Sequence, residues 1–185
     1  MLGWSVVALK RGEYQVAQGR LARARELAGA KAAPPLWYWA ATLASAGLDD
    51  AEGALKAAEE GVAAHPGSAV LRNNLAVLRE FAGDVAGAET MLRAALAEDP
   101  SLPQISKNLA DILYRNGRFD EAREAYDRAA KLAPDLGDDL YFKLGNIAYK
   151  RRDHERARES WRRATELNPA HELARANLEM LDVGR

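Results

Sequence analysis

The sequence predicts an all-α fold in which similar pairs of antiparallel helices follow one another along the chain. Alanine accounts for 38 of the 185 residues, and Leu, Glu and Arg are also abundant, a composition that favours helix over sheet. Apolar residues recur every three or four positions, which is the spacing of one helix face. Pro66, Pro100, Pro134 and Pro169 stand 34, 34 and 35 residues apart, so the pattern repeats with the length of one helix pair.

The clearest unit spans residues 103–136 and contains two amphipathic helical patterns. Gly117 lies between them and can adopt the left-handed conformation that ends a helix at little cost. Pro134 ends the second pattern because it has no backbone N–H and cannot continue a helix. The apolar positions are Leu109, Ile112 and Leu113 in the first helix and Ala122, Tyr126 and Ala129 in the second.

The same pattern can be laid over the rest of the chain. In the unit at 138–171, Arg152 stands where the two preceding units have Gly83 and Gly117, and His154 stands where the unit at 103–136 has Phe119. In the unit at 33–67, the turn at residues 47–50 is expected to be about two residues longer than the others. The assigned units are 1–31, which begins inside its first helix, 33–67, 69–102, 103–136 and 138–171, followed by a closing helix at 172–185.

With Ala110, Gly117, Ala122, Tyr126 and Pro134 at these offsets, the chain resembles the tetratricopeptide repeat (TPR) family. The resemblance covers essentially the whole chain and is most specific from residue 69 to 171. It implies one right-handed superhelical TPR solenoid over residues 1–185, built from antiparallel helix pairs. In that geometry the first helix of each pair lines a concave groove and the second helix lies on the outside.

Composition and charge narrow the chemistry that the chain can carry. The 26 Lys and Arg against 27 Asp and Glu give a formal net charge of −1, so no global field favours nucleic acid or an anionic membrane. Cysteine is absent, which removes disulfides and thiolate metal sites. His65, His154 and His171 fall in different units, and no pair has metal-ligand spacing on one helix. We therefore expect no metal, no cofactor and no catalytic site.

The sequence also bears on location. No apolar run approaches the roughly 20 residues of a membrane-spanning helix. The apolar stretch Leu2–Leu9 has no basic residues ahead of it, unlike a signal peptide. We expect a soluble chain without a membrane span and favour a cytoplasmic over a periplasmic location. The richness in Ala and Arg favours a bacterial gene.

The candidate binding residues come from the first helix of each pair. Positions 2, 6, 9 and 13 of a unit step by four, three and four residues, so they share the face opposite the packing face. Peptide-binding members of the family use asparagine at position 6 to hold a peptide main chain, since its amide both donates and accepts. The alternative is a solvated asparagine on a polar face. The candidate groove residues are Tyr38, Asn74, Val77, Phe81, Asn108, Asp111, Arg115, Lys143, Asn146, Lys150 and Asn177.

These residues also suggest the character of a ligand. Val77 and Phe81 predict an apolar part of the groove, whereas Arg115, Lys143 and Lys150 predict a cationic part. The expected ligand is an extended segment that is apolar at one end and acidic towards the other. The carboxylate clamp of chaperone-binding family members is not expected, because several of its positions differ here.

The predicted function is a non-catalytic protein–protein interaction scaffold that binds an extended peptide or partner segment in the groove. One alternative is the docking or regulatory region of a larger enzyme such as a glycosyltransferase or methyltransferase. Another is a self-assembling scaffold. Trp4, Val7 and Ala8 are expected to be uncovered on one side, which predicts self-association through the N-terminal unit.

Overall fold

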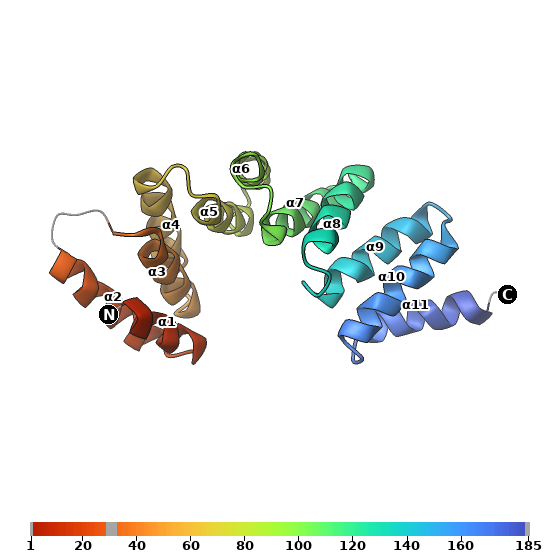
Figure 1. Cartoon of the computed structure of the whole chain (residues 1–185), viewed down its shortest axis with the longest axis horizontal. Coiled ribbons are helices and arrows are strands. Elements are labelled where there is room, and N and C mark those ends of the chain that lie inside the picture. Colours follow the sequence, from red (N-terminus) through yellow and green to blue (C-terminus); the bar gives the residue numbers. More distant parts are fainter. Residues whose placement is uncertain (1, 29–32, 184–185) are drawn as a thin grey trace. The chain divides into compact units, whose positions relative to one another are not determined.

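The computed structural model describes residues 2–28 and 33–183, which form eleven α-helices and no strand (Figure 1). The predicted all-α fold of helix pairs is confirmed. Residues 1 and 29–31 of the first predicted unit, Ala32, and residues 184–185 of the closing helix lie outside the described residues. The helices are α1 (Leu2–Lys10), α2 (Tyr14–Ala28), α3 (Pro35–Gly47), α4 (Ala51–Ala64), α5 (Ala69–Phe81), α6 (Val85–Glu98), α7 (Pro103–Arg115), α8 (Phe119–Leu132), α9 (Asp138–Lys150), α10 (His154–Leu167) and α11 (Glu172–Val183).

The chain divides into two compact units. Unit 1 spans Met1–Asp99 and holds α1 to α6, and unit 2 spans Pro100–Arg185 and holds α7 to α11. Within each unit, every helix packs against the next one along the chain. In unit 1 the first helices α1, α3 and α5 also contact one another in that order. This is the stacking that lets short helix pairs bury apolar faces that one pair cannot bury alone.

Each of the five helix pairs in the described residues has a turn of three residues, 11–13, 48–50, 82–84, 116–118 and 151–153. The longer turn expected at 47–50 is therefore wrong, because α3 continues through Gly47 and leaves a turn of the common length. The middle residue of every turn has a positive φ. Gly117 takes this conformation freely, whereas Arg152 takes it at φ 64° despite its Cβ.

Alanines explain how closely the helices of a pair approach. The fourth residue of the second helix is alanine in all five pairs, and each of these alanines is completely buried. A methyl side chain at a crossing lets the two backbones come close, while a large residue one turn later fills the space towards the next pair. The buried alanines are Ala17, Ala54, Ala88, Ala122 and Ala157, and the large residues are Leu21, Leu92, Tyr126 and Trp161.

In the pair α3–α4, the space towards the next pair is filled by a side chain of the first helix and not of the second. Ala58 stands where other pairs have a large residue, and Tyr38 of α3 occupies the volume instead, with only 5% of its surface exposed. A Cβ on Gly61 would lie 2.8 Å from the Tyr38 Cβ, so glycine there makes room for the ring. Tyr38 is thus a core residue, and its assignment to the groove is wrong. By the helix starts, 34 residues apart, the equivalent of Asn74 is the buried Ala40.

Candidate functional site

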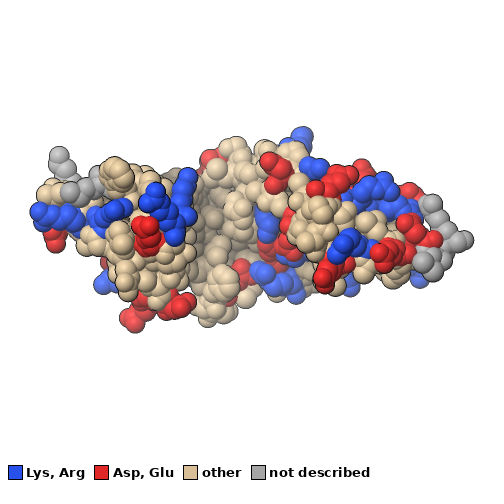
Figure 2. Space-filling view, turned by 90° about the horizontal axis from the view of Figure 1, so that it is seen from below, with Lys and Arg blue, Asp and Glu red and all other residues tan. Residues whose placement is uncertain are grey.

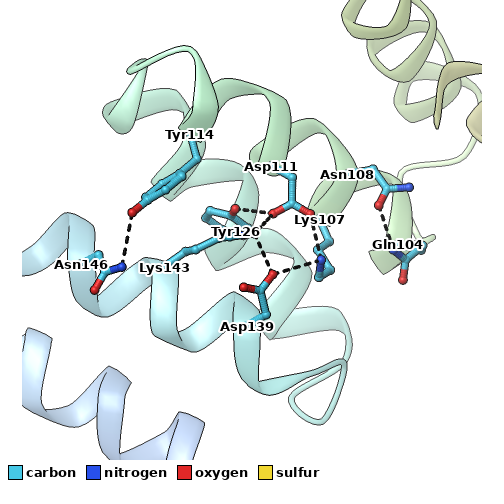
Figure 3. Close-up of polar contacts among 9 residues, drawn as sticks. All are labelled: Gln104, Lys107, Asn108, Asp111, Tyr114, Tyr126, Asp139, Lys143 and Asn146. Carbon is cyan, nitrogen blue, oxygen red and sulfur yellow. Dashed lines mark hydrogen bonds and ion pairs between the residues drawn. The ribbon is translucent and has the colours of Figure 1, made fainter. Parts of the chain in front are cut away.

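A polar network on the first helices of unit 2 forms the candidate site (Figure 3). At its centre the Asp111 carboxylate, on α7, accepts three hydrogen bonds. The donors are the Lys107 ammonium at 2.8 Å, the Lys143 ammonium of α9 at 2.7 Å and the Tyr126 hydroxyl of α8 at 2.5 Å. One carboxylate therefore joins three successive helices.

Asp139 of α9 is the second carboxylate of the network. It accepts a hydrogen bond from Lys143 at 2.6 Å and lies 3.7 Å from the Lys107 ammonium. The side chain of Asp139 is 50% exposed, whereas that of Asp111 is only 13% exposed. Two lysines and two carboxylates thus neutralise one another.

The environment shifts the pKa values of the central groups. Burial by itself raises the pKa of Asp111, but the hydrogen bonds from Lys107, Lys143 and Tyr126 outweigh it, so the pKa lies below its ordinary value. Burial likewise lowers the pKa of Lys143, and its hydrogen bonds to Asp111 and Asp139 reverse that effect and raise it. The pKa of Tyr126 is raised, first by burial and then by the Asp111 carboxylate. At neutral pH Asp111 and Lys143 are therefore charged, and the phenol of Tyr126 is neutral.

Amide side chains flank the network on both sides. On α7, the Gln104 amide donates to the Asn108 Oδ1 at 2.8 Å (Figure 3). On α9, Asn146 donates to the Tyr114 hydroxyl at 3.3 Å, while its Oδ1 accepts from Trp161 and from Asn177 of α11. Asn146 is thus ordered by hydrogen bonds to neighbouring helices, whereas Gln104 and Asn108 pair within α7.

The C-terminal ends of α7 and α9 carry the remaining cations of this face. Arg115 and Lys150 are both exposed, and the Lys150 ammonium lies 4.9 Å from the centre of the Phe119 ring. The Phe119 ring packs edge-on against Tyr114 at 5.5 Å between centroids. A cationic and aromatic rim therefore borders the neutral network.

In unit 1 the candidate residues lie on α5. Asn74 is partly buried, and its Oδ1 accepts from Asn73 at 3.5 Å. Val77 is partly buried, Val70 is exposed, and Phe81, the last residue of the helix, is 86% exposed. The face of α5 is thus more apolar than that of α7.

The structure assembles part of the predicted set. It brings together Asp111 and Lys143 directly, and Asn146 with Asn177. Lys143 was expected to offer a charge to a ligand, but two carboxylates already engage it, so Lys150 is the exposed cation to which this role passes. Sequence reasoning missed Lys107, Tyr114 and Tyr126. The sequence did contain a signal for Lys107, since Lys107–Asp111 and Asp139–Lys143 are both oppositely charged pairs at i, i+4 and run in opposite order.

The described residues provide neither a metal site nor a membrane-spanning helix. In the part of the chain that the structure describes, no group of three or more His, Cys, Asp or Glu side chains is placed to hold a metal ion. No helix among these residues combines the length and apolar character needed to cross a membrane.

Comparison with known proteins agrees with the repeat pattern. Two family models, both described as tetratricopeptide repeat, match residues 73–136 and 138–171, together more than half of the chain. No curated protein sequence matches the chain.

Three solved structures illustrate the similarity of fold. The crystal structure of MamA aligns with a TM-score of 0.67 at 20% identity, covering 77% of this chain and 83% of that chain. YrrB, described as a TPR protein with an unusual peptide-binding site, aligns with a TM-score of 0.67 at 18% identity, covering 94% and 87%. The C-terminal part of a TPR repeat-containing protein from Cytophaga hutchinsonii aligns with a TM-score of 0.71 at 16% identity, covering 98% and 70%. The chain therefore belongs to the tetratricopeptide repeat family, and its fold is that of a protein-interaction scaffold.

Proposed function

We propose that the chain is a non-catalytic scaffold that binds an extended peptide or partner segment on the first-helix face of unit 2. One observation supports this proposal above the others. The polar side chains of this face are already ordered by hydrogen bonds that run from α7 to α9 and from α9 to α11. Groups held in place before a ligand arrives lose little conformational entropy when it binds, so each contact contributes more to affinity.

The amides of the face suit a peptide main chain. A peptide backbone offers alternating donors and acceptors, and an asparagine or glutamine side chain can meet either. Gln104 and Asn108 present such groups on α7, and Asn146 and Asn177 present them on α9 and α11. The peptide-binding site named for YrrB, which shares the fold, is consistent with this use of the fold.

The network changes the expected ligand. Because Asp111 and Asp139 neutralise Lys107 and Lys143, the middle of the face offers no net charge to an acidic ligand. Preference for an acidic side chain is therefore confined to the rim, where Lys150 is exposed. The ligand is expected to be held mainly through its backbone, with an acidic residue only at the end that reaches this rim.

The experiment is peptide selection followed by measured affinities. A displayed random-peptide library is selected on the whole chain, and the strongest peptide is labelled for fluorescence anisotropy. We expect Asn108→Ala to raise the dissociation constant by about 2- to 13-fold, which corresponds to the 0.5–1.5 kcal/mol of one net hydrogen bond. Arg128→Ala, on the exposed side of α8, is the matched control and should leave the affinity unchanged.

Melting temperatures of both variants must equal that of the unchanged chain, so that a loss of affinity reports on binding. If the selected peptides bind Asn108→Ala and Lys150→Ala as tightly as the unchanged chain, the peptide lies on another face and the proposal is wrong. If no peptide is enriched over repeated selections, extended-segment binding is also refuted.

A further inference from the structure

An apolar hollow with a basic border lies on α1 and α2. It has a volume of about 470 Å³ and is lined by Trp4, Val16, Gly19, Arg20 and Arg23. We call this surface the N-terminal hollow. The Trp4 ring is 68% exposed, and Arg20 is fixed by donating to the Trp4 carbonyl oxygen at 2.8 Å. Gly19 forms an open part of the surface, since a Cβ built there would meet nothing within 4 Å. A surface of this kind accepts an apolar side chain next to an acidic group.

The border of the hollow is positively charged through Arg20 and Arg23, although Glu26 partly neutralises Arg23 in an ion pair of 2.7 Å. Residues 2–28 contain five Lys or Arg and two Glu, and Figure 2 shows basic side chains gathered over this end of unit 1. Val7 of α1, beside Trp4 on the same helix, is also exposed. Ala8, which was expected on the same uncovered side, is completely buried.

The helix α11 of unit 2 carries the complementary features. Leu173, Ala176 and Met180 are exposed at i, i+3 and i+7 and form one apolar row. Glu172 and Glu179 stand beside the two ends of this row, one residue ahead of Leu173 and Met180. Neither glutamate makes an ion pair within the described part of the chain. We call these five residues the C-terminal row.

We propose that the N-terminal hollow of one copy of this chain binds the C-terminal row of a second copy. The spacing fits, because Val16, Gly19 and Arg23 on α2 also stand at i, i+3 and i+7, and both rows are about 10 Å long at 1.5 Å per residue. An apolar side chain of the row enters the hollow over Gly19, and the glutamate at the adjacent end of the row meets Arg20 and Arg23. Charge favours the contact of a hollow with a row over a contact of two hollows or of two rows, because either of the latter would bring like charges together.

The pairing joins two different surfaces, so each copy keeps one of each surface for a further neighbour. A contact between unlike surfaces produces a ring if the rotation closes and an open series if it does not. Association should therefore rise with concentration, either to a closed ring, of which a reciprocal dimer is the smallest, or to an open series. This assembly is a function separate from peptide binding. It does not involve Gln104, Asn108 or Asn146 of the proposed peptide site, but Ala176 of the row is next to Asn177 on α11.

The first test fills the hollow without disturbing the fold. Gly19→Leu places a side chain in open space within a helix, where leucine is a better helix former than glycine, so its melting temperature should not fall. Gly3→Leu is the matched control, since Gly3 also lies in a helix with nothing within 4 Å but does not line the hollow. By sedimentation velocity across a concentration series, Gly19→Leu should weaken association at least about tenfold, and Gly3→Leu should not change it.

The second test exchanges charges on whole chains. R20E/R23E and E172R/E179R should each reduce association at low salt, because each brings like charges together across the contact. The chain that carries all four substitutions should associate again, and so should an equimolar mixture of the two double variants. Both rescues should fade as salt rises, since screening shortens the range of the interaction.

The outcomes decide the proposal. Association that rises with concentration, its loss in Gly19→Leu and its rescue by charge exchange support the proposal. A clean monomer at all concentrations, or association that survives Gly19→Leu, would overturn it. Peptide affinity of the Asn108→Ala variant is measured separately, so failure of one proposal leaves the other testable.

Discussion

Replacing Asp111 with asparagine tests whether the polar network stabilises the packing of α7, α8 and α9. Asparagine keeps the shape of the side chain and one acceptor oxygen but removes the negative charge. The Lys107 and Lys143 ammonium groups, whose side chains are mostly buried, are then left with Asp139 alone. The Tyr126 hydroxyl loses a charged acceptor at 2.5 Å.

The magnitude follows from these contacts. A hydrogen bond to a charged group contributes about 1.5–3 kcal/mol, and removing one partner of a buried ion pair costs about 3–5 kcal/mol. Because Asp139 still lies 2.6 Å from Lys143 and 3.7 Å from Lys107, part of the loss is compensated. We expect the free energy of unfolding to fall by about 2–4 kcal/mol. Asp139→Asn is the control, and its half-exposed carboxylate should contribute only about 0–1 kcal/mol.

The assay is urea unfolding followed by circular dichroism at several pH values. The folded pKa of Asp111 lies below its unfolded value of about 3.9, so its contribution is fully present above that value and is lost as the pH falls through the folded pKa. The difference between the unchanged chain and Asp111→Asn should therefore be constant from about pH 5 to 8 and shrink below about pH 4. A difference under about 0.5 kcal/mol at pH 7, or one that does not shrink in acid, would refute the reasoning.

Three further predictions concern packing, backbone and alkaline pH. Gly145→Ala should lower the free energy of unfolding by about 1–3 kcal/mol in urea titrations, because the new Cβ would overlap the buried Trp161 ring; a neutral result would mean that the indole can move aside. Arg152→Gly should raise it by about 0.5–1.5 kcal/mol, since glycine adopts φ 64° without strain, and a lower melting temperature would contradict this. The folded pKa values of Tyr126 and Lys143 are raised, so the stability that these groups contribute is present below about pH 10 and is lost as the pH rises further. In that range the Tyr126→Phe variant should lose less stability than the unchanged chain. Equal losses in urea titrations would contradict this prediction.

Most of the fold could be predicted because helix pairs are specified locally. Turn residues, crossing alanines and the 34-residue period all lie within one pair. The pair α3–α4 was misaligned because its large core residue, Tyr38, comes from the first helix and not from the second. Ala58 was the available signal. A small residue at a position where the other pairs have a large one leaves a volume that another side chain must fill.

The candidate site was predicted less completely, because its main contacts join residues about 32 positions apart. A helical wheel places Asp111 and Lys143 on equivalent faces, but only the packing of α7 against its neighbours brings their charges within 2.7 Å. Tyr126 was identified correctly as a core residue, yet its hydroxyl reaches out of the core to Asp111. A tyrosine at a position that is leucine in two of the other pairs was the signal for a polar partner nearby.

Chains built from similar helix pairs face a particular folding error, in which one pair docks against a pair that is not its proper neighbour. The opposite order of charge along α7 and α9 discriminates against this error. Lys107 and Asp111 match Asp139 and Lys143, whereas the corresponding positions of α5 are the uncharged Asn73 and Val77. An α9 that docked on α5 would cover Lys143 without a second carboxylate, at a cost of several kcal/mol. The complementary order of charges thus favours the correct pairing of α7 with α9 while the chain folds.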